Sequence, residues 1–249
     1  MTQVTLAGPH GPLPVYVARP DGEGPWPGVV VVHDAFGMTT DVRAQADWLA
    51  DAGYLAVVPD LMSWGGTARC LRSLFGELRR RQGRGFDEIE AARRWLTEQD
   101  GSTGRVGIIG FCMGGGFALL HAPRRDYAAA SVNYGQGIGT PDPYGAEFLA
   151  GACPVVGSYG GADRSLRGKA AQLEATLASL GVAHDVKEYP GAPHGFMNDH
   201  DPAEIPVVMR VMTRMLGARH DAEATADARR RILSFFGTHL GGGSAGYRD

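Results

Sequence analysis

One cysteine lies where a buried strand is expected to turn sharply into a helix. Residues 105–109 form an apolar run typical of a short buried strand, and residues 114–121 begin with glycines and continue as an apolar helix. Gly110 and Gly114 stand two residues before and two after Cys112, which is the spacing of a G-x-nucleophile-x-G elbow. A Cβ at either glycine would collide with the neighbouring strand or helix. The motif predicts that Cys112 is a nucleophilic thiol exposed at the carboxyl edge of a sheet.

The expected position of Cys112 at a helix N-terminus also favours reactivity. Unpaired N–H groups and the positive end of the helix dipole stabilise a thiolate there and can hold an oxyanion. The alternative for Cys112 is a buried structural cysteine, because free cysteines are commonly buried. The paired glycines favour the nucleophile. Cys70 and Cys153 lack this setting, and we expect both to be inert.

An acid and a histidine follow the elbow in the order that such a nucleophile requires. Asp163 comes after a strand expected at 154–159, and His194 comes after a strand at 183–189, in a loop rich in turn formers. Taken singly, Asp163 resembles a turn or helix-capping aspartate and His194 a surface-loop histidine. Their shared order and placement at strand ends instead predict a Cys-His-Asp triad.

The alternation of strand and helix patterns predicts the fold class. It is typical of an α/β fold with a mostly parallel central sheet and helices on both faces. We expect one domain over residues 1–240, a disordered tail at 241–249 and, at 202–219, a segment that either packs as a helix or covers the active site. The opening strands are expected as an antiparallel pair at 4–6 and 13–18, and helices are expected at 40–52, 85–98, 114–121, 166–180 and 222–240.

Composition excludes several classes of protein. A formal charge of −3 over 249 residues gives no basic field for nucleic acid. No apolar run reaches the length of a membrane span, and three cysteines without a secretory leader indicate a cytoplasmic protein. His200 and His220 with the neighbouring aspartates fit no zinc spacing, so we expect neither a metal nor a cofactor, and we interpret both histidines as surface-loop residues.

Five segments resemble the dienelactone hydrolase family, which belongs to the α/β-hydrolase superfamily. They are residues 33–37, 54–61, 110–115, 161–163 and 192–196, and the likeness runs from about the first strand to the last helix. The resemblance implies an α/β-hydrolase fold in which Cys112 is the nucleophile, His194 the base and Asp163 its orienting acid. It also implies that the backbone N–H groups of Ala35 and Met113 form the oxyanion hole.

Two positions depart from the pattern of this family. Asp34 stands where the family carries a glutamate that pairs with the thiol, and Asn198 stands where dienelactone-specific members carry an arginine for the substrate carboxylate. Arg69 and Arg72 are candidates for a second such arginine. We expect a lining suited to a neutral or bulky apolar substrate. Its candidate residues are Asp34, Phe36, Trp64, Tyr134, Phe196 and Asn198, with Met209 or Met212 as further possibilities.

The function that follows is hydrolysis of a small ester or lactone, similar to a dienelactone or other enol lactone, through a thioester acyl-enzyme. This is the activity of a carboxymethylenebutenolidase-like enzyme. Two alternatives remain open from the residues alone: a thioesterase or acyltransferase that uses the same triad, and a non-catalytic small-molecule binder. The oligomeric state is open between a monomer and a homodimer.

Overall fold

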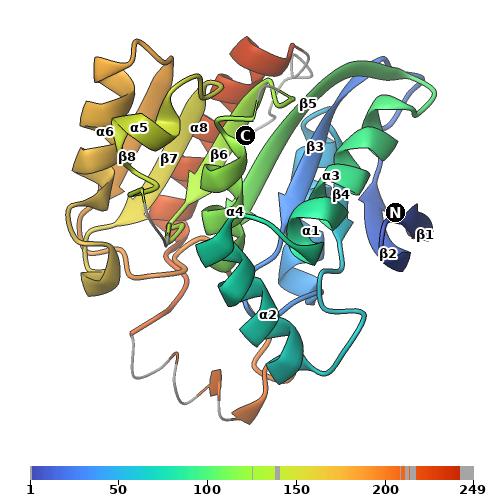
Figure 1. The fold of residues 1–249 in the computed structure, drawn as a ribbon, viewed down its shortest axis with the longest axis horizontal. Helices are drawn as coiled ribbons and strands as arrows, with labels where there is room; N and C mark the ends of the chain where they lie inside the picture. Colours follow the sequence, from blue (N-terminus) through green and yellow to red (C-terminus); the bar gives the residue numbers. More distant parts are fainter. Residues whose placement is uncertain are drawn as a thin grey trace.

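The computed structural model describes residues 2–124, 126–137, 141–207, 209–210, 213 and 217–241. Eight strands in this part of the chain form one sheet in the order β1-β2-β4-β3-β5-β6-β7-β8 (Figure 1). β1 and β2 are antiparallel, β2 is antiparallel to β4, and the six strands from β3 to β8 are parallel. The strands are β1 (Thr2–Gly8), β2 (Gly11–Ala18), β3 (Trp26–Val32), β4 (Leu55–Pro59), β5 (Ser102–Phe111), β6 (Ala129–Asn133), β7 (Val155–Gly160) and β8 (His184–Tyr189).

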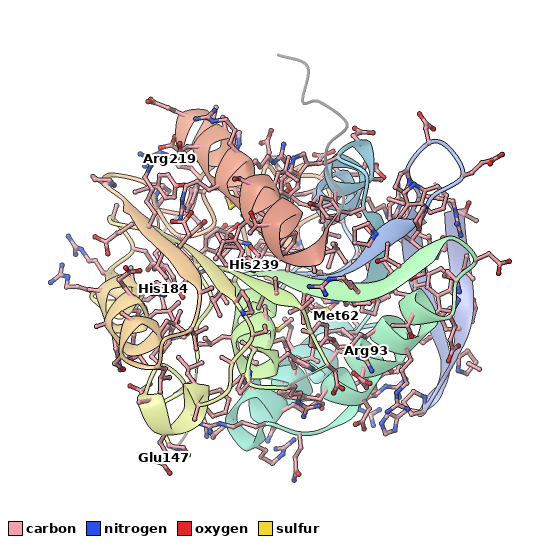
Figure 2. The ribbon with its side chains drawn as sticks, turned by 90° about the horizontal axis from the view of Figure 1, so that it is seen from above. Met62, Arg93, Glu147, His184, Arg219 and His239 are labelled. Atoms are coloured by element: carbon pink, nitrogen blue, oxygen red, sulfur yellow. The ribbon has the colours of Figure 1, made fainter. Side chains whose placement is uncertain are left out.

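Two layers of helices cover the sheet. Helices α1 (Thr40–Asp51) and α8 (Ala222–Leu240) lie on one face, and α3 (Arg84–Thr97), α4 (Met113–His121) and α6 (Lys169–Ser179) lie on the other (Figure 2). Two outer helices pack on this second group: α2 (Thr67–Arg80) against α3 and α4, and α5 (Ala146–Leu149) against α6. Strands β3, β4 and β6 are buried along their whole length, as parallel strands covered on both faces must be. The fold class expected from the alternating pattern is confirmed.

The helix boundaries agree with the sequence patterns except in a few places. The helix expected at 166–180 is divided into a short 3-10 helix, η1 (Arg164–Leu166), and α6, because Gly168 between them has a φ of +76°. Strand β6 and helices α2 and α5 are not among the elements that the sequence patterns predict. In the segment 202–219, residues 208, 211–212 and 214–216 lie outside the described residues, as do residues 242–249 of the tail.

None of the helices in the described part of the chain has the length and hydrophobicity of a membrane span.

The parallel topology brings six loops to one edge of the sheet, because the carboxyl ends of parallel strands meet there. The loops at the edge begin with His33 after β3, Asp60 after β4, Cys112 after β5, Tyr134 after β6, Gly161 after β7 and Pro190 after β8. Every residue of the expected triad therefore lies at this edge.

Candidate active site

The elbow between β5 and α4 has strained geometry. Cys112 has φ +54° and ψ −113°, a conformation that residues with a Cβ rarely adopt. A Cβ on Gly110 would lie 2.0 Å from the carbonyl oxygen of Gly114, and one on Gly114 would lie 2.1 Å from that of Val32. Only glycine fits at either place, and the turn holds the Cys112 backbone between strand and helix.

Cys112 is the most accessible of the three thiols. Its side chain is partly exposed, whereas Cys70 and Cys153 are buried. Burial raises the pKa of the Cys70 thiol, and it raises that of Cys153 to about 12. Cys112 precedes the first turn of α4, where backbone N–H groups have no partner within the helix. These surroundings suit a nucleophilic thiol at Cys112 and an unreactive one at the other two positions.

The loops after β7 and β8 are joined to each other, and this places Asp163 beside His194. The Ala162 N–H donates to the carbonyl of Ala192 at 3.0 Å, and the Asp163 Oδ2 lies 2.6 Å from the His194 Nδ1. Asp163 also caps η1, since its Oδ1 accepts hydrogen bonds from the Ser165 N–H at 2.9 Å and the Ser165 hydroxyl at 2.6 Å. The carboxylate is thus both a helix cap and the partner of the histidine.

Hydrogen bonding decides the protonation states of this pair. Burial alone would raise the pKa of Asp163, but its bonds from His194 and Ser165 lower it. Burial alone would lower the pKa of His194, but hydrogen bonds with Asp163 and Cys112 and the charges of both raise it to about 10. The His194 imidazole therefore lies between the Asp163 carboxylate and the Cys112 sulfur, and both favour its charged form.

The loop that carries His194 is fixed by neighbouring elements. The carbonyl of Phe196 accepts from the Asp221 N–H at 2.9 Å and from the Thr225 hydroxyl at 2.8 Å, at the start of α8. The ring of Tyr134 meets the imidazole of His194 edge-on, with centroids 5.4 Å apart. The first two bonds hold the backbone of the His194 loop, and the Tyr134 ring packs against the imidazole that bonds Asp163.

A tight turn after β3 carries the first of the two expected oxyanion donors. The Asp34 Oδ1 accepts from the Phe36 N–H at 2.8 Å, and the Asp34 carbonyl lies 2.7 Å from the His33 Nδ1. These bonds hold Ala35 in a partly exposed turn. Met113, the second expected donor, is the first residue of α4. The assignment of both N–H groups to an oxyanion hole stays a prediction.

The expected substrate-binding residues are not equally accessible. Phe36 and Trp64 are partly exposed, whereas Tyr134 and Phe196 have no exposed surface and pack against each other. Tyr134 and Phe196 therefore lie in the core beneath His194, where Tyr134 packs against the imidazole. Trp64 has the guanidinium groups of Arg69 and Arg84 over its ring, at 5.3 and 5.0 Å.

The three remaining candidates are Arg72, Met209 and Met212. Arg72 is exposed on α2, and Arg84, which the sequence did not single out, takes a place beside Trp64. Met209 is partly buried, while Met212 lies outside the described residues.

Asn198 and His200 belong to a buried polar group. Asn198 donates to the Asp41 carboxylate at 2.6 Å and accepts from the Tyr134 hydroxyl at 2.5 Å, while His200 Nε2 lies 2.8 Å from the Asp34 Oδ2. The interpretation of His200 as a surface-loop residue is wrong, since its side chain is only 14% exposed. Sequence reasoning also missed Asp41 and Ser165, whose partners are set by the tertiary fold. The described residues contain no cluster of three or more histidine, cysteine or acidic side chains arranged for a metal ion.

A parallel sheet of this topology, with an acid and a histidine on the loops after β7 and β8 and a strained elbow after β5, defines an α/β-hydrolase. A model of the dienelactone hydrolase family matches residues 13–240, and the chain belongs to this family of hydrolases.

Individual relatives agree with the family assignment. A Yersinia pestis protein provisionally named a carboxymethylenebutenolidase is 29% identical over 254 residues, which is 95% of this chain and 88% of the relative. The carboxymethylenebutenolidase of Pseudomonas putida is 32% identical over 126 residues, 47% of this chain and 53% of the relative. A provisionally assigned dienelactone hydrolase from Klebsiella pneumoniae subsp. pneumoniae MGH 78578 superposes with a TM-score of 0.76 at 24% identity, covering 94% of this chain and 97% of its own.

Proposed function

We propose that this protein hydrolyses small esters or lactones through a thioester on Cys112, with His194 and Asp163 completing the triad. The observation that carries the proposal is the strained cysteine elbow beside a histidine that is bonded to a buried carboxylate at 2.6 Å. The names of the relatives, which specify carboxymethylenebutenolidases, support a lactone or activated ester as the substrate.

Acylation uses a proton that His194 already carries. The Cys112 sulfur attacks the carbonyl carbon as a thiolate, an S–C bond forms, and the carbonyl oxygen becomes an oxyanion at the N–H groups of Ala35 and Met113. The intermediate collapses as the C–O bond to the leaving group breaks. His194 gives its proton to the departing oxygen, which leaves a thioester and a neutral imidazole.

Deacylation restores the resting state. The neutral His194 takes a proton from a water molecule, whose oxygen attacks the thioester carbonyl. The second intermediate expels the Cys112 thiolate, releases the carboxylic acid, and leaves His194 protonated. Asp163 stabilises the imidazolium and fixes its tautomer at both stages.

The sulfur nucleophile favours a particular class of substrate. A thiolate is a good leaving group, so a tetrahedral intermediate partitions forward only when the other leaving group departs equally easily. Enol lactones and aryl esters meet this condition, whereas amides do not. Three unpaired thiols are consistent with a reducing compartment, and we place the enzyme in the cytoplasm.

The test is turnover of enol lactones, aryl esters and acyl thioesters by the wild type and by Cys112→Ala, with intact-mass analysis of rapidly quenched reactions. We expect hydrolysis of the activated esters and an acyl adduct on Cys112, and neither in the variant. Cys153→Ser is the matched control, because it removes a thiol outside the site and should leave turnover unchanged. Preferred thioester cleavage, or transfer to an added alcohol, would instead assign a thioesterase or an acyltransferase, and binding without turnover would contradict the proposal.

A further inference from the structure

His200 makes a buried ion pair with the turn that carries Ala35. Its Nε2 lies 2.8 Å from the Asp34 Oδ2, and its ring packs edge-on against Phe36, with centroids 4.7 Å apart. The other oxygen of the Asp34 carboxylate accepts from the Phe36 N–H. One imidazole therefore holds the residues on both sides of Ala35, through a charge on one side and a ring contact on the other.

The segment that presents His200 is itself fixed to the N-terminal turn of α1. The Asp41 carboxylate accepts from the Asn198 amide at 2.6 Å and from the Asp199 N–H at 2.7 Å. The Glu204 carboxylate accepts from the N–H of Thr40 at 2.9 Å and from its hydroxyl at 2.8 Å. Since residues on both sides of His200 are anchored to α1, the imidazole is a rigid support for the turn.

The geometry at Nδ1 favours the charged imidazole. This atom is buried, has no hydrogen-bond partner within the described residues, and lies 3.9 Å from the Asp41 Oδ2. In a neutral ring that donates from Nε2 to Asp34, the Nδ1 lone pair would face a second carboxylate. In the imidazolium, an N–H faces that carboxylate instead, and the charge is shared between the two acids.

We propose that protonated His200 is a positioning residue, which holds the 33–37 turn so that the Ala35 N–H points at the oxyanion. The inference rests on the proposed function for its catalytic meaning, but the coupling of His200 to the turn is a property of the resting protein.

The coupling has a defined pH dependence. The groups that face His200 are Asp34 on the turn, Asp41 on α1 and Glu204 on its own segment. Burial alone would lower the pKa of His200, but the hydrogen bond with Asp34 and the charges of these three carboxylates raise it above its ordinary value. The raised pKa means that the ion pair is complete below the unfolded value of 6.5 and is lost as pH rises through the folded value.

The first measurement is NMR of the resting protein across pH, which requires no substrate. We expect the backbone amide signals of Ala35 and Phe36 to shift with the same midpoint as the His200 ring signal. His200→Gln, which keeps a hydrogen-bond donor without the charge, should abolish this common transition. His220→Gln is the matched control, because His220 is exposed and lies outside the site, and it should leave the transition intact.

The second measurement is kinetic. His200→Gln should lower kcat ~10-fold to 100-fold with little change in KM, because a displaced donor is felt mainly in the transition state. His200→Lys, which keeps a cation at higher pH, should recover part of the loss. Iodoacetamide should alkylate Cys112 at the wild-type rate in both variants, since alkylation uses no oxyanion hole.

The two measurements separate failure of this inference from failure of the proposed function. Amide signals of Ala35 and Phe36 that do not follow the His200 midpoint would overturn the inference, whatever the activity. A protein without turnover that still shows the common transition would contradict the hydrolase and leave the coupling standing. Unchanged kcat in a folded, active His200→Gln would show that the turn needs no such support.

Discussion

Single residues in this site have more than one partner, and the partners decide their chemistry. Asp163 caps η1 and bonds His194, so its carboxylate is immobile before any substrate arrives. One oxygen of the Asp163 carboxylate bonds His194 Nδ1. Removal of the carboxylate charge would therefore change both the preferred tautomer of His194 and its pKa.

Asp163→Asn is expected to lower kcat/KM on the order of 10²- to 10⁴-fold, because an amide can favour the wrong imidazole tautomer. Its side chain can still accept from Ser165, so the loop should keep its fold. The measurement is steady-state kinetics on an aryl ester beside circular dichroism, with the exposed Asp100→Asn as the control. Near-normal rates in Asp163→Asn would leave Asp163 as a helix cap alone.

Asn198 has a consequence for specificity. Its amide is neutral and bonds Tyr134 and Asp41, so this position supplies no cation for a substrate carboxylate. A charge-assisted hydrogen bond contributes about 1.5–3 kcal/mol, so neutral aryl esters or enol lactones should exceed a carboxylate-bearing dienelactone by roughly tenfold or more in kcat/KM. A preference for the carboxylate-bearing dienelactone would contradict this prediction. It would indicate that Arg69 or Arg84, beside Trp64, binds the substrate carboxylate, and Arg69→Gln would then lower activity on the acidic substrate alone.

At the scale of elements, the elbow depends on close backbone contacts between β3, β5 and α4. Gly110 and Gly114 lie where a Cβ would overlap carbonyl oxygens, and backbone cannot move aside as a flexible side chain can. The same contacts bring the start of α4 against β3, which is followed by the turn that carries Ala35. The glycines therefore set the spacing between the proposed nucleophile and one expected oxyanion donor.

Gly110→Ala is expected to destabilise the protein by at least ~3 kcal/mol, or to prevent folding, because overpacking against rigid backbone cannot relax. Gly66→Ala is the matched control: no atom lies within 4 Å of a Cβ there, and its φ is −71°. Urea denaturation of both variants measures the difference, and soluble expression yields supply it if Gly110→Ala does not fold. Equal stability of the two variants would show that the elbow is less tightly packed than the contacts indicate.

At the scale of the whole molecule, charged groups on separate loops link the loops across the carboxyl edge of the sheet. The Asp163–His194 pair joins the loops after β7 and β8, and the Asp34–His200 pair joins the turn after β3 to the segment after His194. The carboxylate of each pair is buried, so the charge state of each pair contributes to the stability of the folded protein.

The stability difference between wild type and Asp163→Asn should depend on pH. The lowered pKa of Asp163 contributes stability that is present above its unfolded value of 3.8 and is lost as pH falls. The raised pKa of His194 contributes stability that is complete below 6.5 and is lost as pH rises toward about 10. The difference should be largest between these limits and smaller at alkaline pH, as measured by urea unfolding at several pH values. A constant difference across this range would mean that the pair does not link folding to protonation.

Much of the architecture and of the proposed triad was open to prediction from the sequence. The elbow is local, since Gly110, Cys112 and Gly114 lie within five residues, and the helices α1, α3, α4 and α8 follow from apolar periodicity. The order of nucleophile, acid and base also needs no coordinates once each is placed at a strand end. The sequence does not predict strand β6, because its alanine-rich residues have little strand preference. It forms a strand because it pairs with β5 on one side and β7 on the other.

Only the tertiary structure decided which polar groups became partners. His200 and Asp34 are far apart in the sequence, and no local pattern marks them as an ion pair. The same holds for the bonds from Asn198 to Asp41 and Tyr134, which turned an expected substrate-binding side chain into a buried link. Hydrophobic periodicity and turn residues can be recognised within short stretches of sequence. A buried charged side chain, in contrast, is paired only when packing brings distant loops together. The sequence by itself thus determined the elements and the strand ends that carry the proposed triad, and the packed fold determined the contacts and protonation states around it.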